Sequence, residues 1–290
     1  MLNFKKVLLL YKLSAYQIYF SGRKTSLPGN NNPALKKETA HFKKAHDEHY
    51  SSLKRVEKIF KEHKVSYTKR RRGRKIDYSK FDLIVTVGGD GTFLEAARNV
   101  KNQAVLGINS SSRYSVGRLC AADAKNFKVI LRKVLRGQFK VKNLYRLRLQ
   151  FDHKKSVDAV NDLLVCHENP AALSRYSLNV KGVKEEQRSS GIWVSTAAGS
   201  SGAIQSAGGR VFSLFDKKFQ YRPRELFSGK NRRYRLKGGT LSPRQSIVVA
   251  SLMPKGVIYV DGAHVHFPFK YGSKVKISLS PKPLKTLTFV

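Results

Sequence analysis

A short apolar run that ends in a cluster of glycines constrains the fold of this chain more than any other feature. Residues Leu83 to Val87 have the length and composition of a buried β-strand. The run leads into Gly88-Gly-Asp-Gly91, where glycine allows close ligand approach. A helical pattern then starts at Thr92. A strand, a glycine turn and a helix N-terminus together suit phosphate, because free N–H groups and the helix dipole favour an anion.

Two details of this stretch refine the prediction. Thr92 and Glu95 have the T-x-x-E spacing of a capping box, which predicts that they close the N-terminus of the helix. Asp90 is unexpected, because a carboxylate repels phosphate, so we expect it to serve chemistry or a metal ion. The loop is neither a Walker A motif nor G-x-G-x-x-G. Because glycine turns are common and Asp favours turns, a purely structural role stays open at this point.

The charge of the chain is strongly unbalanced. Its 290 residues include 57 Lys and Arg against 19 Asp and Glu, a formal net charge of +38. Such a field favours polyanions, so nucleic acid, an anionic membrane and phosphorylated metabolites are candidate partners. The charge is spread along the chain, and a host with basic proteins or a surface tuned for solubility explains it equally well. The densest basic run, Lys69 to Lys75, could contact phosphate, RNA or a membrane, but most such runs are solvated loops, which is what we expect here.

Other features favour a globular protein of a reducing compartment. Cys120 and Cys166 are the only cysteines, they have no metal-ligand spacing, and both are expected to be lone buried thiols. No apolar run approaches the roughly 18 residues of a membrane span. The apolar start is too short for a signal peptide and predicts a first strand over Val7 to Tyr11. These features predict a cytoplasmic protein.

The first half of the chain alternates strand and helix patterns, which predicts a parallel sheet. Residues Ser21 to Pro33 are expected to form an exposed loop, and a helix is expected from Ala34 to Lys64. The histidines of that helix are expected to be exposed rather than to bind metal; they are His41, His46, His49 and His63. A further strand is expected over Val105 to Asn109 and a further helix over Phe127 to Arg136.

After Gly137 the pattern changes to short strands joined by polar turns, which predicts an antiparallel second domain with a boundary near residue 138. The predicted strands are residues 140–151, 157–166, 176–180, 191–196, 246–252, 257–260, 265–269 and 275–279. Residues 216–240 are expected to be a basic loop. A second glycine-rich turn, Ser195 to Gly209, follows a strand, with a helix expected from Ser200. It is another candidate anion site, although such small residues also serve close helix packing.

Separate motifs of the chain resemble one family, the NAD kinases. Gly88 to Thr92 is similar to the GGDGT loop of that family. Asn161-Asp162 occurs where the family has Asn followed by an acidic residue, and Ser195 to Gly209 is similar to its S-T-P-T-G-S-T-A-Y…S-A-G-G stretch. Asp261-Gly262 is similar to its C-terminal D-G. The segments that resemble mitochondrial-type members and their bacterial relatives are residues 36–63, 109–120 and 187–191.

The resemblance implies an NAD kinase/diacylglycerol kinase-like fold. Residues 1–137 would form an α/β nucleotide-binding domain with a parallel sheet, and residues 138–275 a β-rich, largely antiparallel domain for NAD binding and oligomerisation. Residues 276–290 would return to the first domain. The substrates would be ATP and NAD, and the γ-phosphoryl group would pass to the adenosine ribose 2′-hydroxyl to give NADP. Mg²⁺ would accompany ATP, and the protein would be a homodimer or homotetramer.

The resemblance also implies roles for single residues. Asp90 would be the general base that accepts the hydroxyl proton. Asn161 and Asp162 would bind hydroxyls of the nicotinamide-side ribose. The residues that would hold phosphates and ATP are Gly88, Gly89, Gly91, Thr92 and Asn109. The residues that would line the dinucleotide pocket are Ser195, Thr196, Ser200, Ser201 and Ser206, and no residue is assigned to a metal.

The chain also departs from the family pattern, and other functions stay open. Ala197 and Ala198 replace Pro and Thr, while Gly202 and Ala203 replace Ala and Tyr, which removes an aromatic ring. GGDGT occurs in lipid kinases of the same superfamily, and a basic surface would suit a lipid substrate. A non-catalytic protein that binds nucleotides or nucleic acid through its basic surface is a further alternative, and such binding would depend strongly on salt.

Overall fold

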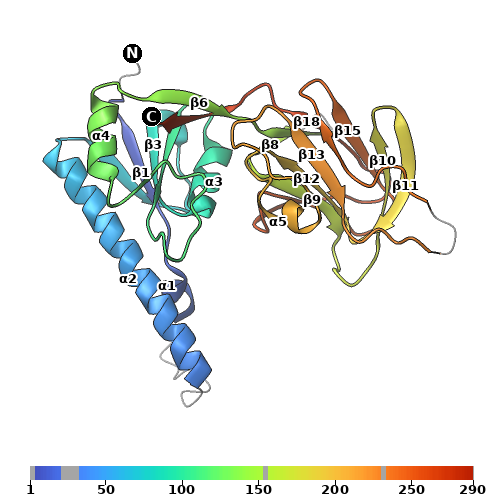
Figure 1. The fold of residues 1–290 in the computed structure, drawn as a ribbon, viewed down its shortest axis with the longest axis horizontal. Coiled ribbons are helices and arrows are strands. Elements are labelled where there is room, and N and C mark those ends of the chain that lie inside the picture. The colour runs from blue at the N-terminus through green and yellow to red at the C-terminus, as the bar shows by residue number, and fades with distance from the viewer. Residues whose placement is uncertain (1–3, 21–32, 153–155, 230–232, 290) are drawn as a thin grey trace. The chain divides into compact units, whose positions relative to one another are not determined.

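The computed structural model describes residues 4–20, 33–152, 156–229 and 233–289, which form two compact units (Figure 1). Unit 1 comprises residues 1–142 and 285–290, and unit 2 comprises residues 143–284. Both limits of unit 2 lie later in the chain than the expected 138 and 275. β6 (Lys140–Leu144) pairs in the sheet of unit 1, and β18 (Lys274–Leu279) pairs with strands of unit 2.

Unit 1 is built on a seven-stranded sheet with the order β2-β1-β3-β4-β19-β6, in which β5 also pairs with β4. The pairings from β2 through β19 are parallel, as the alternating pattern predicts. The strands other than β6 are β1 (Val7–Tyr11), β2 (Tyr67–Arg71), β3 (Leu83–Gly88), β4 (Ala104–Asn109), β5 (Ala122–Asp123) and β19 (Leu284–Thr288).

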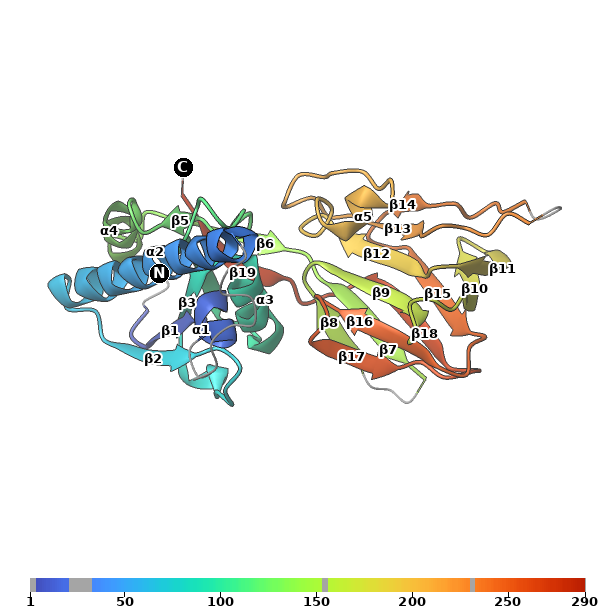
Figure 2. The same cartoon turned by 90° about the horizontal axis from the view of Figure 1, so that it is seen from below.

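Helices cover both faces of this sheet (Figures 1 and 2). The long helix α2 (Pro33–Glu62) and α4 (Phe127–Leu135) lie on one face, and α3 (Asp90–Asn99) lies on the other. Because side chains alternate along a strand, Leu9 packs with Phe60 and Phe127 on the first face, whereas Leu8 and Leu10 point to the opposite face. The short α1 (Ala15–Phe20) packs against α2. None of the described helices has the length and apolar character needed to cross a membrane.

Unit 2 consists of two six-stranded antiparallel sheets, with the orders β11-β10-β15-β18-β7-β8 and β14-β13-β12-β9-β16-β17. Alternate residues of both sheets point inward and share one apolar core, which includes Leu149, Tyr176, Val194 and Ile258. The remaining elements are β7 (Leu147–Phe151), β8 (Ser156–Ala159), β9 (Asp162–His167), β10 (Ser174–Val180), β11 (Val183–Ser189), β12 (Ile192–Thr196), α5 (Ala203–Ser206), β13 (Phe219–Pro223), β14 (Gly239–Leu241), β15 (Ser246–Ser251), β16 (Gly256–Val260) and β17 (Val265–Pro268).

Several predicted elements differ from the observed ones. Residues 140–151 form two strands rather than one, and so do residues 157–166, because the chain turns at Asn161. The basic run expected as a loop begins inside β2, and residues 216–240 include β13. The helix expected from Ser200 is only the single turn α5. The loop expected at 21–33 falls on residues 21–32, which lie outside the described residues, and on Pro33, which begins α2.

Candidate functional site

The glycine turn after β3 has the geometry of a phosphate site. β3 ends at Gly88, and α3 begins at Asp90 with Gly89 as its N-cap. A Cβ atom on Gly88 would lie 2.2 Å from Thr92 Oγ1, and one on Gly89 would lie 2.0 Å from Ser115 Oγ, so neither position has room for a side chain. The first N–H groups of a helix have no acceptor within the helix. The turn therefore offers donors to an anion.

The capping box predicted for Thr92 and Glu95 is wrong. α3 begins before Thr92, and no side chain caps it. Thr92 is 1% exposed, and its Oγ1 has no hydrogen-bond partner within the described part of the chain. Glu95 Oε1 instead accepts a hydrogen bond of 2.6 Å from the Gly73 N–H. Glu95 therefore ties the basic segment after β2 to α3.

Asp90 makes two hydrogen bonds to one loop. Its Oδ1 accepts from the Leu119 N–H at 2.8 Å, and its Oδ2 accepts from the Arg118 N–H at 3.1 Å.

Burial, with the charge of Asp90 as a second cause, raises the pKa of the Cys120 thiol to about 12. Burial also raises the pKa of the Cys166 thiol to about 11. Neither cysteine forms a disulfide, and the raised pKa values keep both thiols protonated near neutral pH. Cys166 is buried, as expected, whereas Cys120 is half-buried.

Asn109, expected to contact phosphate, lies at the end of β4 and organises the same loop. Its Nδ2 donates to the Ser115 carbonyl at 3.0 Å, and its Oδ1 accepts from the Ser111 N–H at 3.1 Å. Gly117 in this loop has φ +61°, and a Cβ there would lie 2.3 Å from Asn109 Nδ2. The side-chain amide of Asn109 therefore holds the backbone of this loop in place.

Helix α2 supports this loop through a buried histidine. His49 Nε2–H donates to the Lys12 carbonyl at 3.0 Å, and Nδ1 accepts from the Ser110 hydroxyl at 2.8 Å. Burial, as the main cause, lowers the pKa of His49 to about 4, so the ring is neutral at physiological pH. The prediction that the histidines of this helix are exposed is therefore wrong for His49, which is 1% exposed, and it holds fully only for His41, because His46 and His63 are half-buried.

In unit 2 the turn between β8 and β9 is held through its backbone. Asp261 Oδ1 accepts from the N–H groups of Val160 at 3.0 Å and Asn161 at 2.7 Å. The Asn161 carbonyl accepts from the Thr196 N–H at 2.9 Å and from Ser195 Oγ at 3.2 Å. The side-chain Oδ1 of Asn161 is buried and has no hydrogen-bond partner among the described residues. The side-chain oxygen of Asn161 therefore takes no part in holding the turn.

Asp162 lies at the start of β9 in a cluster of charged groups. Burial raises the pKa of Asp162 to about 7, and the negative charge of Asp261 contributes to the same shift. Arg146 is 5% exposed, and its Nε and Nη2 have no hydrogen-bond partner among the residues that the structure describes. Burial lowers the pKa of Arg146, and Asp158 and Asp261 oppose that shift. Near neutral pH, Asp162 is therefore balanced between its acid and its carboxylate.

Three of the serine and threonine residues expected to line a pocket are fully buried. Ser195, Thr196 and Ser200 are each 0% exposed. Thr196 Oγ1 donates to the Val160 carbonyl at 2.6 Å, and Ser200 Oγ donates to the Ala197 carbonyl at 2.7 Å. The Thr196 hydroxyl therefore ties the glycine-rich turn to the turn at Asn161, whereas the Ser200 hydroxyl bonds within the glycine-rich turn itself.

The glycines of the second turn allow close approach to the first. A Cβ on Gly199 would lie 2.3 Å from the Asn161 carbonyl oxygen, so the two backbones are in contact. A Cβ on Gly202 would lie 3.7 Å from Asp162 Oδ2. The structure therefore brings the predicted residues Asn161 and Asp162 next to the glycine-rich turn, whereas Ser201 and Ser206 are exposed on it.

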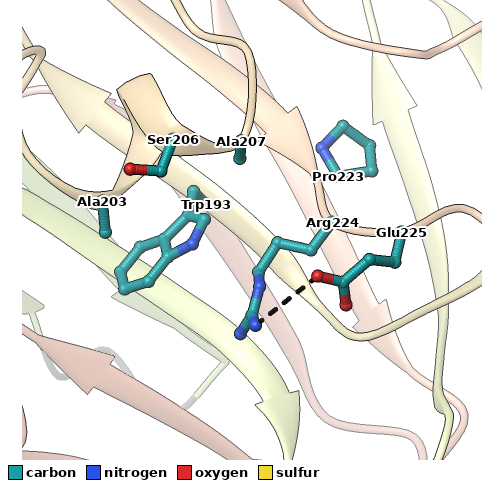
Figure 3. Close-up of a pocket in the computed structure, with 7 residues that line it drawn as sticks. All are labelled: Trp193, Ala203, Ser206, Ala207, Pro223, Arg224 and Glu225. Carbon is teal, nitrogen blue, oxygen red and sulfur yellow. Dashed lines mark ion pairs between the residues drawn. The ribbon is translucent and has the colours of Figure 1, made fainter.

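An open pocket of about 430 Å³ lies beside Ser206 (Figure 3). The indole of Trp193, the only tryptophan in the chain, lines it. Arg224 Nη2 and Glu225 Oε1 are 3.9 Å apart at the same pocket. The other lining residues are Ala203, Ala207 and Pro223. Its volume and its aromatic wall suit a planar ring. The sequence patterns did not single out Trp193, because one tryptophan on a strand carries no motif.

No group of three or more His, Cys, Asp and Glu side chains is arranged to hold a metal ion in the described part of the chain. Sequence patterns also missed Lys12, placed His49 on an exposed helix face, and gave Asp261 only as part of a D-G motif without a role. Each acts on a motif far away in the sequence, so only the fold reveals it.

Known proteins with similar sequences place the chain in one family. Residues 34–139 match the ATP-NAD kinase N-terminal domain. A probable NADH kinase of Oryza sativa subsp. japonica is 34% identical over 229 residues, which cover 71% of this chain and 70% of that protein. An NADH kinase of Arabidopsis thaliana is 31% identical over 221 residues, which cover 68% of this chain and 69% of that protein.

A solved structure agrees with the sequence relatives. The crystal structure of an NAD kinase from Archaeoglobus fulgidus in complex with ATP has a TM-score of 0.70 and 25% identity, and the match covers 98% of this chain and 93% of that one. The two-unit fold and its motifs thus agree with the comparisons. The chain therefore belongs to the NAD kinase family, a class of ATP-dependent kinases.

Proposed function

We propose that this chain transfers the γ-phosphoryl group of ATP to the adenosine ribose 2′-hydroxyl of NAD or NADH, giving NADP or NADPH. The plant relatives named as NADH kinases and the ATP complex of the archaeal NAD kinase support this reaction. The match to the ATP-NAD kinase N-terminal domain favours a dinucleotide acceptor over a lipid. Oligomerisation through unit 2, a cytoplasmic location and closeness to mitochondrial-type members stay predictions.

The turn at Asn161 and Asp162 is the observation that carries the proposal. A ribose presents neighbouring hydroxyl groups, and a carboxylate has enough lone pairs to accept a hydrogen bond from each of them. The Asn161 Oδ1, which has no partner among the described residues, can accept a further one. We assign the hydroxyl groups of the nicotinamide-side ribose to these two side chains, and a ring of the dinucleotide to the pocket at Trp193.

We assign the proton transfer to Asp90. Its oxygens accept N–H groups of Arg118 and Leu119, which fix the carboxylate in one orientation. Each carboxylate oxygen keeps a second lone pair, which can accept the proton of the attacking hydroxyl group. Phosphoryl transfer depends mainly on positioning and charge neutralisation. Mg²⁺ enters with ATP as part of the substrate and neutralises phosphate charge.

The direct test is to incubate the purified chain with MgATP and either NAD or NADH, and to measure NADP and NADPH. We expect product with at least one acceptor and none when ATP is omitted. Vesicles that contain diacylglycerol serve as the competing acceptor. Phosphorylation of the lipid, without phosphorylation of either dinucleotide, would overturn the proposal.

The raised pKa of Asp162, about 7, predicts how dinucleotide binding depends on pH. The ionised carboxylate accepts from two hydroxyls, so we expect the KM for NAD to fall as the pH rises through about 7. Well below that value, each further pH unit lowers the ionised fraction about tenfold. Steady-state kinetics from acid to alkaline pH measure this dependence, and the KM for MgATP serves as the internal control.

The same group has the opposite effect on stability. Its pKa in the folded chain lies above the usual 3.8, so the protonated form favours folding. This contribution is complete below about pH 4 and is lost as the pH rises to about 7. Asp162→Asn should remove both pH dependences. Asp261→Asn should move the midpoint of the KM profile to lower pH, because it removes a neighbouring negative charge. A KM for NAD that is flat across this range in the parent enzyme would rule out Asp162 as the titrating ligand.

A further inference from the structure

The order of strands in unit 1 creates a ligand site at a defined edge of the sheet. β2 and β3 lie on opposite sides of β1, so the winding of the sheet reverses at β1. In open parallel sheets, ligands bind beyond the carboxyl ends of the strands at such a reversal. The register pairs Tyr11 with Arg71 and with Val87. The residues that follow on β2, β1 and β3 are Arg72, Lys12 and Gly88, so two cations end the two strands on one side of the strand that leads into the GGDGT loop.

Contacts place the Arg72 guanidinium at that loop. A Cβ on Gly91 would lie 3.3 Å from Arg72 Nη1, so the guanidinium lies against the first turn of α3. The Arg72 N–H donates to the Tyr11 carbonyl at 2.8 Å, which fixes its backbone beside β1. The Lys12 backbone is fixed in turn by the hydrogen bond from His49 to its carbonyl. Burial and the nearby charge of Arg72 lower the pKa of Lys12, so the two cations lie close enough to repel.

The two cations have no carboxylate partner within 4.0 Å in the part of the chain that the structure describes. The two acidic groups on α3 at this end are engaged elsewhere: Asp90 accepts N–H groups of the following loop, and Glu95 accepts the Gly73 N–H. The Thr92 hydroxyl, buried against Gly88 in the same turn, also has no partner among the described residues. Like charges held together at a helix N-terminus are unfavourable unless an anion joins them.

We propose that Lys12 and Arg72 bind the linear polyphosphate of the nucleotide donor, the triphosphate of ATP. The planar guanidinium can grip one phosphate with two hydrogen bonds, while the ammonium neutralises charge as a compact cation. The N–H groups of the glycine turn complete the site. The assignment of the site to ATP, rather than to the diphosphate of NAD, rests on the proposed function. The inference that Lys12 and Arg72 bind a polyphosphate does not depend on that function.

Binding of inorganic tripolyphosphate, measured by calorimetry, tests the site without any turnover. We expect Arg72→Gln and Lys12→Met each to weaken this affinity at least about tenfold and to raise the KM for MgATP by a similar factor, since charge-assisted contacts are the stronger hydrogen bonds. The KM for NAD should change less than about twofold. Arg74→Gln, an exposed residue of the same basic run, is the charge-matched control and should leave both affinities nearly unchanged.

The outcomes separate this proposal from the proposed function. The polyphosphate site is overturned if tripolyphosphate binds equally well to the parent, Arg72→Gln and Lys12→Met proteins, even if the parent makes NADP. A raised KM for NAD with an unchanged KM for MgATP overturns the assignment to ATP. Tripolyphosphate binding that depends on both residues supports the site even in a chain that phosphorylates no dinucleotide. If Arg72→Gln melts far below the parent, Arg72→Lys keeps the charge without the fork and should give an intermediate affinity.

Discussion

Replacing Asp90 by Asn is expected to lower the kcat for NADP formation by about 100-fold or more, because general-base catalysis typically contributes 10²- to 10⁴-fold. The amide group has no oxygen basic enough to take the hydroxyl proton. Its NH₂ group would also face the N–H of Arg118 or Leu119, where the carboxylate now offers an acceptor. Steady-state kinetics and thermal melting of the same preparation separate these two effects.

A matched variant controls for damage to the loop. Gly117→Ala forces a side chain onto a residue with φ +61° and against the amide of Asn109, yet it leaves Asp90 intact. At an equal loss of melting temperature, Gly117→Ala should retain far more turnover than Asp90→Asn. If Asp90→Asn keeps its kcat within about tenfold of the parent enzyme, Asp90 is not the general base.

Gly199→Ala is expected to damage dinucleotide binding more than any other single methyl group added to unit 2. The new Cβ would lie 2.3 Å from the Asn161 carbonyl oxygen and 2.8 Å from its Cα, so backbone must move. Overpacking of this kind costs about 1–3 kcal/mol or more of folding free energy. The shift would also move the Asn161 side chain, and a displacement of about 1 Å can cost about 100-fold in catalysis. Kinetics with NAD, with melting curves alongside, measure both effects.

Gly202→Ala in the same turn is the control for Gly199→Ala. Its Cβ would approach the Gly199 carbonyl only to 3.1 Å and would lie 3.7 Å from Asp162 Oδ2. We expect a much smaller loss of stability and only a modest rise in the KM for NAD. If Gly199→Ala behaves like Gly202→Ala, the close contact with Asn161 does not position the dinucleotide ligands.

Elements with a regular apolar pattern could be predicted from the sequence. β1 and β3 are short apolar runs buried on both faces of the sheet, and α4 has apolar residues at helical spacing, so these patterns reveal the three elements directly. β2 could not be found in this way. It lies at the edge of the sheet with β1 as its partner, so backbone hydrogen bonds define it while basic side chains remain in solvent. Its Lys69-Arg-Arg71 sequence therefore has the appearance of a solvated loop.

The candidate site was visible in the sequence only where residues stand in short motifs. Asp90 and the Asn161-Asp162 pair belong to such motifs, and the fold places glycine turns beside both. The support of these motifs depends on pairs that are distant in the chain, such as Asp261 with the Asn161 N–H and His49 with the Ser110 hydroxyl. Thr92 and Glu95 are the reverse case. Their spacing fits a capping box, but the Glu95 carboxylate accepts a hydrogen bond from the distant Gly73 N–H instead of capping the helix.

The position of β19 has a consequence for the order in which the protein folds during synthesis. Domains commonly fold from the N-terminus as the chain leaves the ribosome. Here β19 inserts between β4 and β6, and its Thr286 hydroxyl donates to the Val105 carbonyl at 3.0 Å. The edge of β4 that β19 covers therefore stays open until all of unit 2 has been made. Unit 1, which carries the GGDGT loop, is therefore completed only after unit 2 has been synthesised. Until then the GGDGT loop lies on a sheet that lacks β19.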